Sequence, residues 1–222
     1  INSFHFIDSL SSSLKGKETV VTDMGTSFTC TMQTFEIKNH MKQRLFTSSG
    51  LAAMGFGLPG AIGASFAKPY KQIICIAGDG GFMFNIQELQ TIKHHNLPIK
   101  IFILENQGYL TMQLMQKKNF KKLTGSDIKS GISFPNFKKI AEGFNLDYLK
   151  LKKSNIDGQL KKIFSNKKPI IVEVNMPKFQ QLVPRVQAQL LKDGSFANPE
   201  FDNLFPHLSD KILKRERQKA NF

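Results

Sequence analysis

The stretch that decides the fold covers residues 73–108 and reads IICIAGDGGFMFNIQELQTIKHHNLPIKIFILENQG. It contains two mostly apolar, β-branched runs, at residues 73–77 and 99–104, each followed by a loop of polar and glycine residues. Such runs are typical of strands covered on both faces. Between them, residues 85–95 carry apolar side chains at near-helical spacing, and Asn-Leu-Pro ends the pattern before the second run. We therefore expect a unit of strand, helix and parallel strand.

The same alternation continues on both sides of this unit. Further strands are expected at residues 19–22, 146–151 and 170–175, and further helices at 58–67, 137–144 and 155–165. This order predicts an α/β fold with a mainly parallel, doubly wound sheet and helices on both faces. After residue 175 the pattern ends in a proline-containing segment and a charged stretch at 211–219, predicted to be a tail or a short surface helix. We expect one domain over residues 1–180 and a C-terminal extension with a basic tail over 181–222.

Length and composition favour a single core. The chain has 222 residues, of which 41% are hydrophobic, enough for one sizeable core but not for two large domains. It begins at Ile1 without an initiating methionine, so we expect a piece of a longer protein. No apolar run approaches the roughly 18 residues of a membrane span, and we predict a soluble, cytoplasmic protein without a membrane partner. Cys30 and Cys75 lack CxxC spacing and are predicted to be buried and reduced.

The net charge of +14 raises the question of nucleic acid. The lysines come as scattered pairs, for example at 117–118, 121–122 and 152–153, and no recognisable nucleic-acid-binding motif surrounds them. We interpret the charge as a solvated basic face and expect no nucleic-acid partner.

Residues 55–60, GFGLPG, match the GxGxxG pattern of dinucleotide-binding sites. That pattern has to follow a strand directly, whereas residues 47–54 make a poor strand and the convincing strand comes later. We therefore exclude a dinucleotide site. The small residues Ala61, Gly63, Ala64 and Ser65 instead suggest a helix packed closely against a neighbour.

Chemistry is carried by the loops after the two central strands. The first loop is Gly78-Asp79-Gly80-Gly81, and Asn106 follows Asp79 after 27 residues, in the second loop. Open α/β sheets bind ligands at the carboxyl ends of their strands, so both loops can face one site. A carboxylate and an amide oxygen suit Mg²⁺. Glycines let the backbone approach phosphate groups at the start of a helix, so we predict a diphosphate with its magnesium.

A bare Gly-Asp-Gly is common in turns, but the segment 78–106 as a whole resembles the thiamine-diphosphate signature, in which Gly-Asp-Gly is followed after some 25 residues by Asn. Residues 47–64 and 85–92 resemble the acetolactate synthase branch, and the resemblance spans most of residues 1–206. It implies the C-terminal, diphosphate-binding domain of a thiamine-diphosphate enzyme of the acetolactate synthase type.

The resemblance implies roles for individual positions. The magnesium ligands would be the side chains of Asp79 and Asn106 and the carbonyl of Gly108. Residues in contact with the cofactor would be Thr26, Ser27, Ala52, Met54, Gly78, Asp79, Gly80, Gly81, Asn106 and Gly108. The catalytic assignments are Met54, which would force the cofactor into its bent shape, and the Ala52 carbonyl, which would accept a hydrogen bond from the aminopyrimidine. By residue type alone, without the flanking resemblance, Met54 would be interpreted as a core residue.

The resemblance also implies an activity, namely decarboxylation of a 2-keto acid such as pyruvate and transfer of the acyl unit to an acceptor. A thiamine-diphosphate-dependent decarboxylase or lyase is the alternative within this class. The activating glutamate is expected on an N-terminal pyrimidine-binding domain of the same or a partner subunit. We therefore predict that this chain is inactive alone and that the intact protein is a homodimer or homotetramer.

Two positions depart from the family pattern. Glu105 stands where the family has its first signature Asn, and Met115 stands where a Trp lines the substrate channel. The second departure leaves the acceptor open. A hypothesis of another class, a non-enzymatic nucleotide- or nucleic-acid-binding module, predicts no magnesium-dependent binding of thiamine diphosphate.

Overall fold

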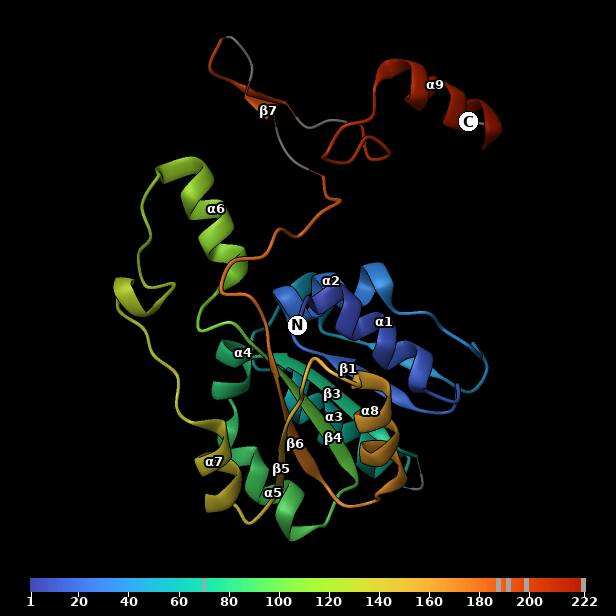
Figure 1. Cartoon of the computed structure of the whole chain (residues 1–222), viewed down its shortest axis with the longest axis vertical. Helices are drawn as coiled ribbons and strands as arrows, with labels where there is room; N and C mark the ends of the chain where they lie inside the picture. The colour runs from blue at the N-terminus through green and yellow to red at the C-terminus, as the bar shows by residue number, and fades with distance from the viewer. Residues whose placement is uncertain (70, 187–188, 191–192, 198–199, 221–222) are drawn as a thin grey trace. The chain divides into compact units, whose positions relative to one another are not determined.

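The structure is a computed structural model that describes residues 1–69, 71–186, 189–190, 193–197 and 200–220 (Figure 1). It divides into two compact units, Ile1–Gln180 and Gln181–Phe222. The first unit contains the six-stranded sheet and the candidate site, and the second contains the C-terminal segment.

The first unit is built on a six-stranded parallel sheet in the order β2-β1-β3-β4-β6-β5. The strands, in that order, are Arg44–Phe46, Thr19–Thr22, Ile73–Gly78, Ile99–Glu105, Ile170–Asn175 and Asp147–Lys150. The predicted α/β class and parallel sheet are confirmed. The edge strand β2 was not predicted, because it has only three residues and none of them is fully buried.

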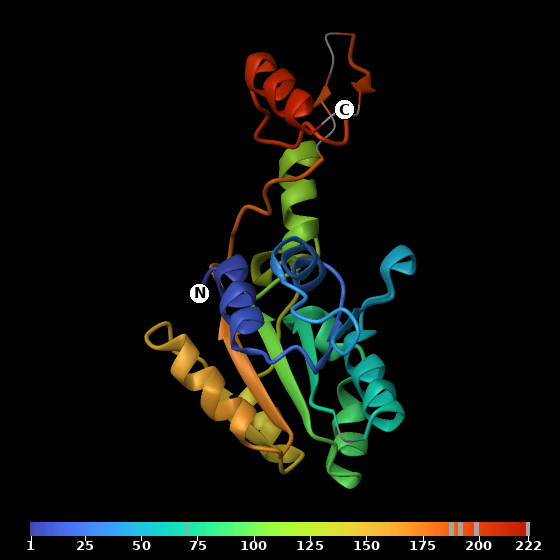
Figure 2. The same cartoon turned by 90° about the vertical axis from the view of Figure 1, so that its right-hand side faces the viewer.

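Helices cover both faces of this sheet (Figure 2). One face carries α1 (Ser3–Ser13), α2 (Thr26–Thr34) and α8 (Ile156–Ser165). The other carries α3 (Gly57–Ala67), α4 (Asp79–Met83), α5 (Leu89–His94) and α7 (Phe137–Gly143), while α6 (Leu110–Phe120) follows β4. In the described residues, no helix combines the length and apolar character that crossing a membrane requires.

The strands bury alternate residues on opposite faces, as the period of two requires. Cys75 and Ile101 belong to the core beneath α3, α5 and α7. On the other face, the ring of Phe102 lies 5.4 Å from that of Phe6 in α1 and 6.3 Å from that of Phe164 in α8. Both cysteines are buried and free, as predicted.

The helix predicted over residues 85–95 is interrupted. A short 3-10 turn, Ile86–Glu88, precedes α5, and Asn85 leaves the helical region with φ −132°. The Asn85 side chain donates a hydrogen bond to the carbonyl of Gly55 instead of continuing a helix. A tertiary contact therefore overrides the local periodicity here.

Lys100 is a fully buried lysine near the amino end of β4, and its ammonium group donates a hydrogen bond to the carbonyl of Lys168. Burial lowers the pKa of Lys100 from 10.5 to about 8, against the opposing charge of Asp147. The charged form is therefore less favourable in the folded state than in the unfolded state. The folded state releases this proton near pH 8, whereas the unfolded state keeps it up to about pH 10.5. The free energy of unfolding therefore rises with pH between these two values.

We predict that Lys100→Met removes this gain. Between pH 8 and pH 10.5 the unfolding free energy of the wild type is expected to rise by about 2 kcal/mol relative to the variant. Urea denaturation across this range measures the difference. Lys161→Met, at an exposed position in α8, is the matched control and is expected to show no such trend. A constant difference between wild type and Lys100→Met would show that the buried ammonium is not titrating.

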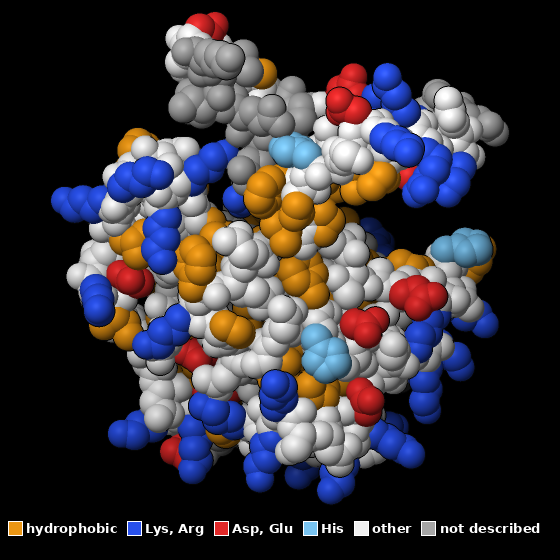
Figure 3. Space-filling view, turned by 45° about the horizontal axis from the view of Figure 1, so that its top comes forward, with side chains coloured by type: hydrophobic (Ala, Val, Ile, Leu, Met, Phe, Trp, Pro, Cys, Tyr) orange, Lys and Arg blue, Asp and Glu red, His pale blue; other side chains and the backbone are white. Residues whose placement is uncertain are grey.

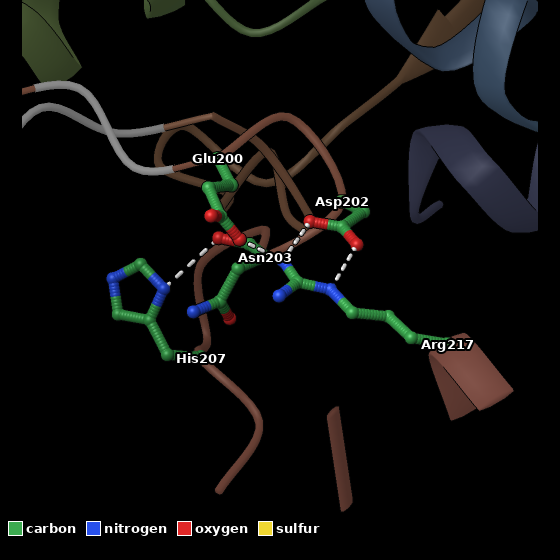
Figure 4. A network of polar contacts seen from close by, with 5 residues as sticks. All are labelled: Glu200, Asp202, Asn203, His207 and Arg217. Atoms are coloured by element: carbon green, nitrogen blue, oxygen red, sulfur yellow. Dashed lines mark hydrogen bonds and ion pairs between the residues drawn. The ribbon is translucent and has the colours of Figure 1, made fainter. Parts of the chain in front are cut away.

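The second unit contains the antiparallel pair β7 (Gln189–Leu190) and β8 (Phe196–Ala197), and helix α9 (Asp210–Lys219). The predicted short surface helix at 211–219 is thus present. Figure 4 shows how α9 is tied to the preceding loop: the Arg217 guanidinium donates to Asp202 at 2.7 and 2.8 Å and also pairs with Glu200. In the same loop, Nδ1 of His207 lies 3.1 Å from the carbonyl oxygen of Asn203. Because these ion pairs are partly exposed, each is expected to contribute little to stability.

Candidate active site

A cavity of about 250 Å³ lies at the carboxyl ends of β1, β3 and β4. These three strands are neighbours, and β2 and β3, which follow β1 in the sequence, lie on opposite sides of it. Such a reversal of strand order is where open α/β sheets bind ligands. The lining residues are Asp23, Met24, Gly25, Thr26, Ala52, Met54, Gly78, Asp79, Gly80, Gly81, Asn106, Gly108, Tyr109, Leu110, Thr111 and Met112.

Asp79 joins the two loops that the sequence singled out. Its side chain is 1% exposed, and its carboxylate accepts hydrogen bonds from four backbone amides. One is that of Gly80, at 2.7 Å, and three belong to residues 106–108, at 3.1, 2.7 and 3.3 Å. Burial still raises the pKa of Asp79 to about 6, although these hydrogen bonds oppose the shift. A cation beside this carboxylate would offset the cost of burying its charge.

Asn106 contributes a buried amide to the same cavity. None of the described residues accepts a hydrogen bond from its Nδ2. Buried polar groups are nearly always paired, so this NH₂ donor is a position for a hydrogen-bond acceptor of a ligand, such as a phosphate oxygen. Beside it, a side chain at Gly78 would meet no atom within 4 Å, so this part of the cavity is open. The observed carboxylate, amide and open space fit a diphosphate with Mg²⁺.

Two of the three glycines in the Gly78–Gly81 motif are required by the protein's own side chains. A Cβ atom on Gly80 would lie 2.0 Å from Cε1 of Tyr109, and one on Gly81 would lie 2.9 Å from Oδ1 of Asp23. From the sequence, we expected glycine at these positions because it lets the backbone approach phosphate closely. The structure adds that Tyr109 and Asp23 already occupy the space that side chains at these positions would need.

The loop before α3 forms a second wall of the cavity, to which Ala52 and Met54 contribute. Met54 is 40% exposed, so the interpretation as a core residue is not supported. Ala52 has φ 51°, in the left-handed region that residues with a side chain rarely adopt.

Thr26, one of the two residues predicted to hold the diphosphate from α2, lines the cavity. Ser27 is buried, its hydroxyl donates to the carbonyl of Met24 at 2.9 Å, and it does not line the cavity. Met115, the predicted channel residue, is 45% exposed on α6 and lies outside the lining. Met112, one helical turn earlier, lines the cavity in its place.

Sequence reasoning missed seven of the lining residues, among them Asp23, Tyr109 and Met112. A signal existed for Asp23, which follows β1 directly, just as Asp79 follows β3. Residues 55–60 lead into α3 and do not follow a strand directly, because a loop with the 3-10 turn Ser49–Leu51 separates them from β2; the context required for a dinucleotide site is therefore not met. Of the small residues expected to pack closely, Ala61 and Ser65 are buried, whereas Gly63 is exposed and has open space around it.

A parallel sheet whose switch-point cavity is lined by a buried carboxylate, a buried amide and several glycines is an arrangement with which α/β domains bind ligands. The family model described as "Thiamine pyrophosphate enzyme, C-terminal TPP binding domain" matches residues 23–174. The chain belongs to this family, and its cofactor is thiamine diphosphate, another name for thiamine pyrophosphate.

The chain is also similar to acetolactate synthases. It is 34% identical over 179 residues to acetolactate synthase 2, chloroplastic, of Zea mays, covering 78% of this chain and 28% of the relative. It is 30% identical to the acetolactate synthase large subunit of Lactococcus lactis, covering 85% and 33%. It is 33% identical to the isozyme 2 large subunit of Escherichia coli, covering 75% and 30%. The chain therefore spans about a third or less of these relatives' length.

Proposed function

We propose that the chain is the cofactor-binding part of a thiamine-diphosphate-dependent carboligase of the acetolactate synthase type. The observation that carries the proposal is that Asp79 and Asn106 line one cavity. The buried Nδ2 donor of Asn106 has no hydrogen-bond partner among the described residues. Asp79, Asn106 and the carbonyl of Gly108 would hold Mg²⁺. Gly80, Gly81 and Thr26 would contact the diphosphate.

The cofactor supplies the nucleophilic carbon that decarboxylation of a 2-keto acid requires. The protein's residues bind and orient it. Met54 and Ala52 belong to the second wall of the cavity, and Met54 would press against the middle of the cofactor. Tyr109 and Leu110 lie beside the proposed phosphate-binding loop and would exclude water from it.

We propose that the substrate is pyruvate or a close relative and that the two-carbon unit passes to an acceptor other than a second pyruvate. The motive is Met115, which is flexible and unbranched where the family pattern has a channel Trp. It lies outside the cavity lining, so its proposed effect is on the channel by which an acceptor reaches the cavity. Met112 would add a second flexible side chain at the cavity. The net charge of +14 is compatible with an anionic acceptor.

The experiment is to incubate the full-length enzyme with labelled pyruvate and candidate aldehydes or ketones and to identify the products by mass. We expect a mixed product to form at least about tenfold faster than acetolactate, the range that pocket contacts provide. Met115→Trp is the matched variant and is expected to shift products towards acetolactate. If acetolactate forms efficiently and no other acceptor competes, the proposed second acceptor is wrong and the activity is that of an acetolactate synthase.

We further propose that an N-terminal pyrimidine-binding domain of the same or a partner subunit completes the site. Apolar side chains stay exposed near the cavity, among them Leu51 at 88%. Figure 3 shows exposed apolar side chains on one face, with Lys and Arg side chains distributed among and around them. An apolar surface of this kind is typical of an interface.

This proposal predicts that the full-length protein is a dimer or tetramer and that this chain alone gives no turnover above background. Light scattering and a pyruvate-consumption assay measure the two properties. A full-length enzyme that is active and strictly monomeric would contradict an intersubunit site.

A further inference from the structure

Gly55, in the loop between β2 and α3, is held from both sides. Its backbone N–H donates to Oδ1 of Asp23 at 3.1 Å, and its carbonyl accepts from Nδ2 of Asn85 at 2.9 Å. Its φ of +88° is a conformation that favours glycine. A Cβ atom here would lie 2.6 Å from Cβ of Phe84 and 2.8 Å from Nδ2 of Asn85. The backbone of Gly55 is therefore fixed by two hydrogen bonds, and there is no space for a side chain at this position.

Asp23 provides one half of this clamp. It is 1% exposed, and its carboxylate also accepts from the backbone amides of Met24, at 2.6 Å, and Gly57, at 3.0 Å. None of the ion pairs in the described part of the chain includes Asp23. A buried charge is costly unless it is compensated, and here backbone amides from two segments compensate it. The carboxylate thus fastens residues 55–57 to the end of β1.

Asn85 provides the other half from outside the cavity. It lies in the interruption between α4 and α5 and is not among the residues that line the cavity. Its Oδ1 accepts from the side chain of Gln87 at 3.2 Å, which orients the amide so that Nδ2 faces Gly55. The contact explains why the helix predicted over residues 85–95 does not start at Asn85.

The clamp acts on the second wall of the cavity. Met54 directly precedes Gly55. Ala52 lies two residues before Met54 and has a left-handed φ of 51°. A residue with a side chain keeps such a conformation only when its surroundings enforce it. Because Ala52 and Met54 both line the cavity, any movement of Gly55 changes the shape of this wall.

We propose that Asp23 and Asn85 are positioning residues which, by clamping Gly55, hold Ala52 and Met54 in place against the non-phosphate part of thiamine diphosphate. The proposal rests on the proposed function of the cavity. It separates two walls: the loops of Asp79 and Asn106 for the diphosphate, and the clamped loop for the rest of the cofactor. Asp23 lines the cavity beside Gly81, whereas Asn85 lies outside the lining, so Asn85→Asp is the variant that tests the second wall alone. Damage to the clamp is then expected to impair binding of the whole cofactor but not of its phosphate end.

The chain offers a matched control for a purely structural carboxylate. Glu18, at the opposite end of β1, is also buried and accepts hydrogen bonds from the backbone amides of Lys15 and Lys17, both at 2.9 Å. It fastens a loop as Asp23 does, but far from the cavity-forming ends of the strands. Glu18→Gln therefore reports the general cost of weakening such a carboxylate.

The experiment compares Asp23→Asn, Asn85→Asp and Glu18→Gln in the full-length protein. Asn at position 23 must turn its NH₂ group towards one of the amides it now accepts from, and Asp at position 85 has no donor for the Gly55 carbonyl. Two readouts are taken: hydrogen exchange in a peptide covering residues 51–58, and affinities for magnesium with thiamine diphosphate and for magnesium with inorganic pyrophosphate.

For both clamp variants we expect at least about tenfold faster exchange in residues 51–58 and about tenfold weaker binding of thiamine diphosphate, the loss of one hydrogen bond to a fixed group. In Asn85→Asp the affinity for pyrophosphate is expected to change less than about twofold. Glu18→Gln is expected to change neither the exchange rate nor either affinity by more than about twofold. A uniform loss of both affinities in Asn85→Asp, or unchanged exchange in residues 51–58, would overturn the positioning role. If the wild type binds no thiamine diphosphate, the proposed function fails, while the exchange measurement still tests the clamp.

Discussion

Replacing Asp79 by alanine is expected to weaken magnesium-dependent binding of thiamine diphosphate at least about 100-fold, because removing one partner of a buried charge pair costs ~3–5 kcal/mol. The carboxylate is proposed to contact the metal directly. It also holds the backbone of residues 106–108, from which the other proposed metal ligands come. One substitution therefore disturbs the whole metal site. Isothermal calorimetry on the assembled enzyme measures the affinity.

Asp79→Asn separates the metal contact from support of the loop. Asparagine keeps the volume and one acceptor oxygen for the amides of residues 106–108 but carries no charge. We expect a similar loss of affinity with a smaller drop in melting temperature than in Asp79→Ala. If either variant binds thiamine diphosphate as tightly as the wild type, Asp79 is not a metal ligand.

Gly80→Ala is expected to have the second largest effect. The added methyl group would lie 2.0 Å from Cε1 of Tyr109, so the ring must leave its place beside the cavity. Overpacking of this kind costs ~1–3 kcal/mol, and we expect a fall of several degrees in melting temperature with a roughly tenfold or greater loss of cofactor affinity. Differential scanning calorimetry and cofactor titration measure both.

Gly63→Ala in α3 is the matched control, because a methyl group there meets no atom within 4 Å. Its melting temperature is expected to be unchanged or raised, since alanine favours helix. Adding Tyr109→Ala to Gly80→Ala removes the clashing ring and is expected to recover the melting temperature at least in part. A Gly80→Ala protein as stable as Gly63→Ala would mean that Tyr109 does not pack on Gly80.

The predictable parts of the fold were the β-branched runs and the helices with a clear apolar period. Strands β1 and β6 have the predicted bounds, and β3, β4, α3, α7 and α8 differ from prediction by one residue each. Helices α2 and α6 were missed because neither shows a clear apolar stripe: α2 is rich in Thr and Ser, and α6 mixes Met, Gln and Lys. Both become helical through their place after a strand, which local propensity does not encode.

Within the site, the residues found from sequence were those joined by motif spacing, chiefly Asp79 and Asn106. Those missed depend on contacts between distant segments. Asn85 reaches Gly55, 30 residues away, and Asp23 reaches Gly57, 34 residues away. No periodicity links such pairs. Met115 is the opposite case, because it was chosen from a resemblance in linear sequence. In the structure, Met112, one helical turn earlier, lines the cavity and Met115 does not.

The central claim is that this cavity binds thiamine diphosphate through a divalent cation. The most direct measurement is calorimetric titration of thiamine diphosphate into the full-length wild-type protein, once with magnesium and once after chelation with EDTA. We predict saturable one-to-one binding with magnesium and at least about 100-fold weaker binding without it. Equal affinity in both conditions, or no binding in either, would contradict the claim.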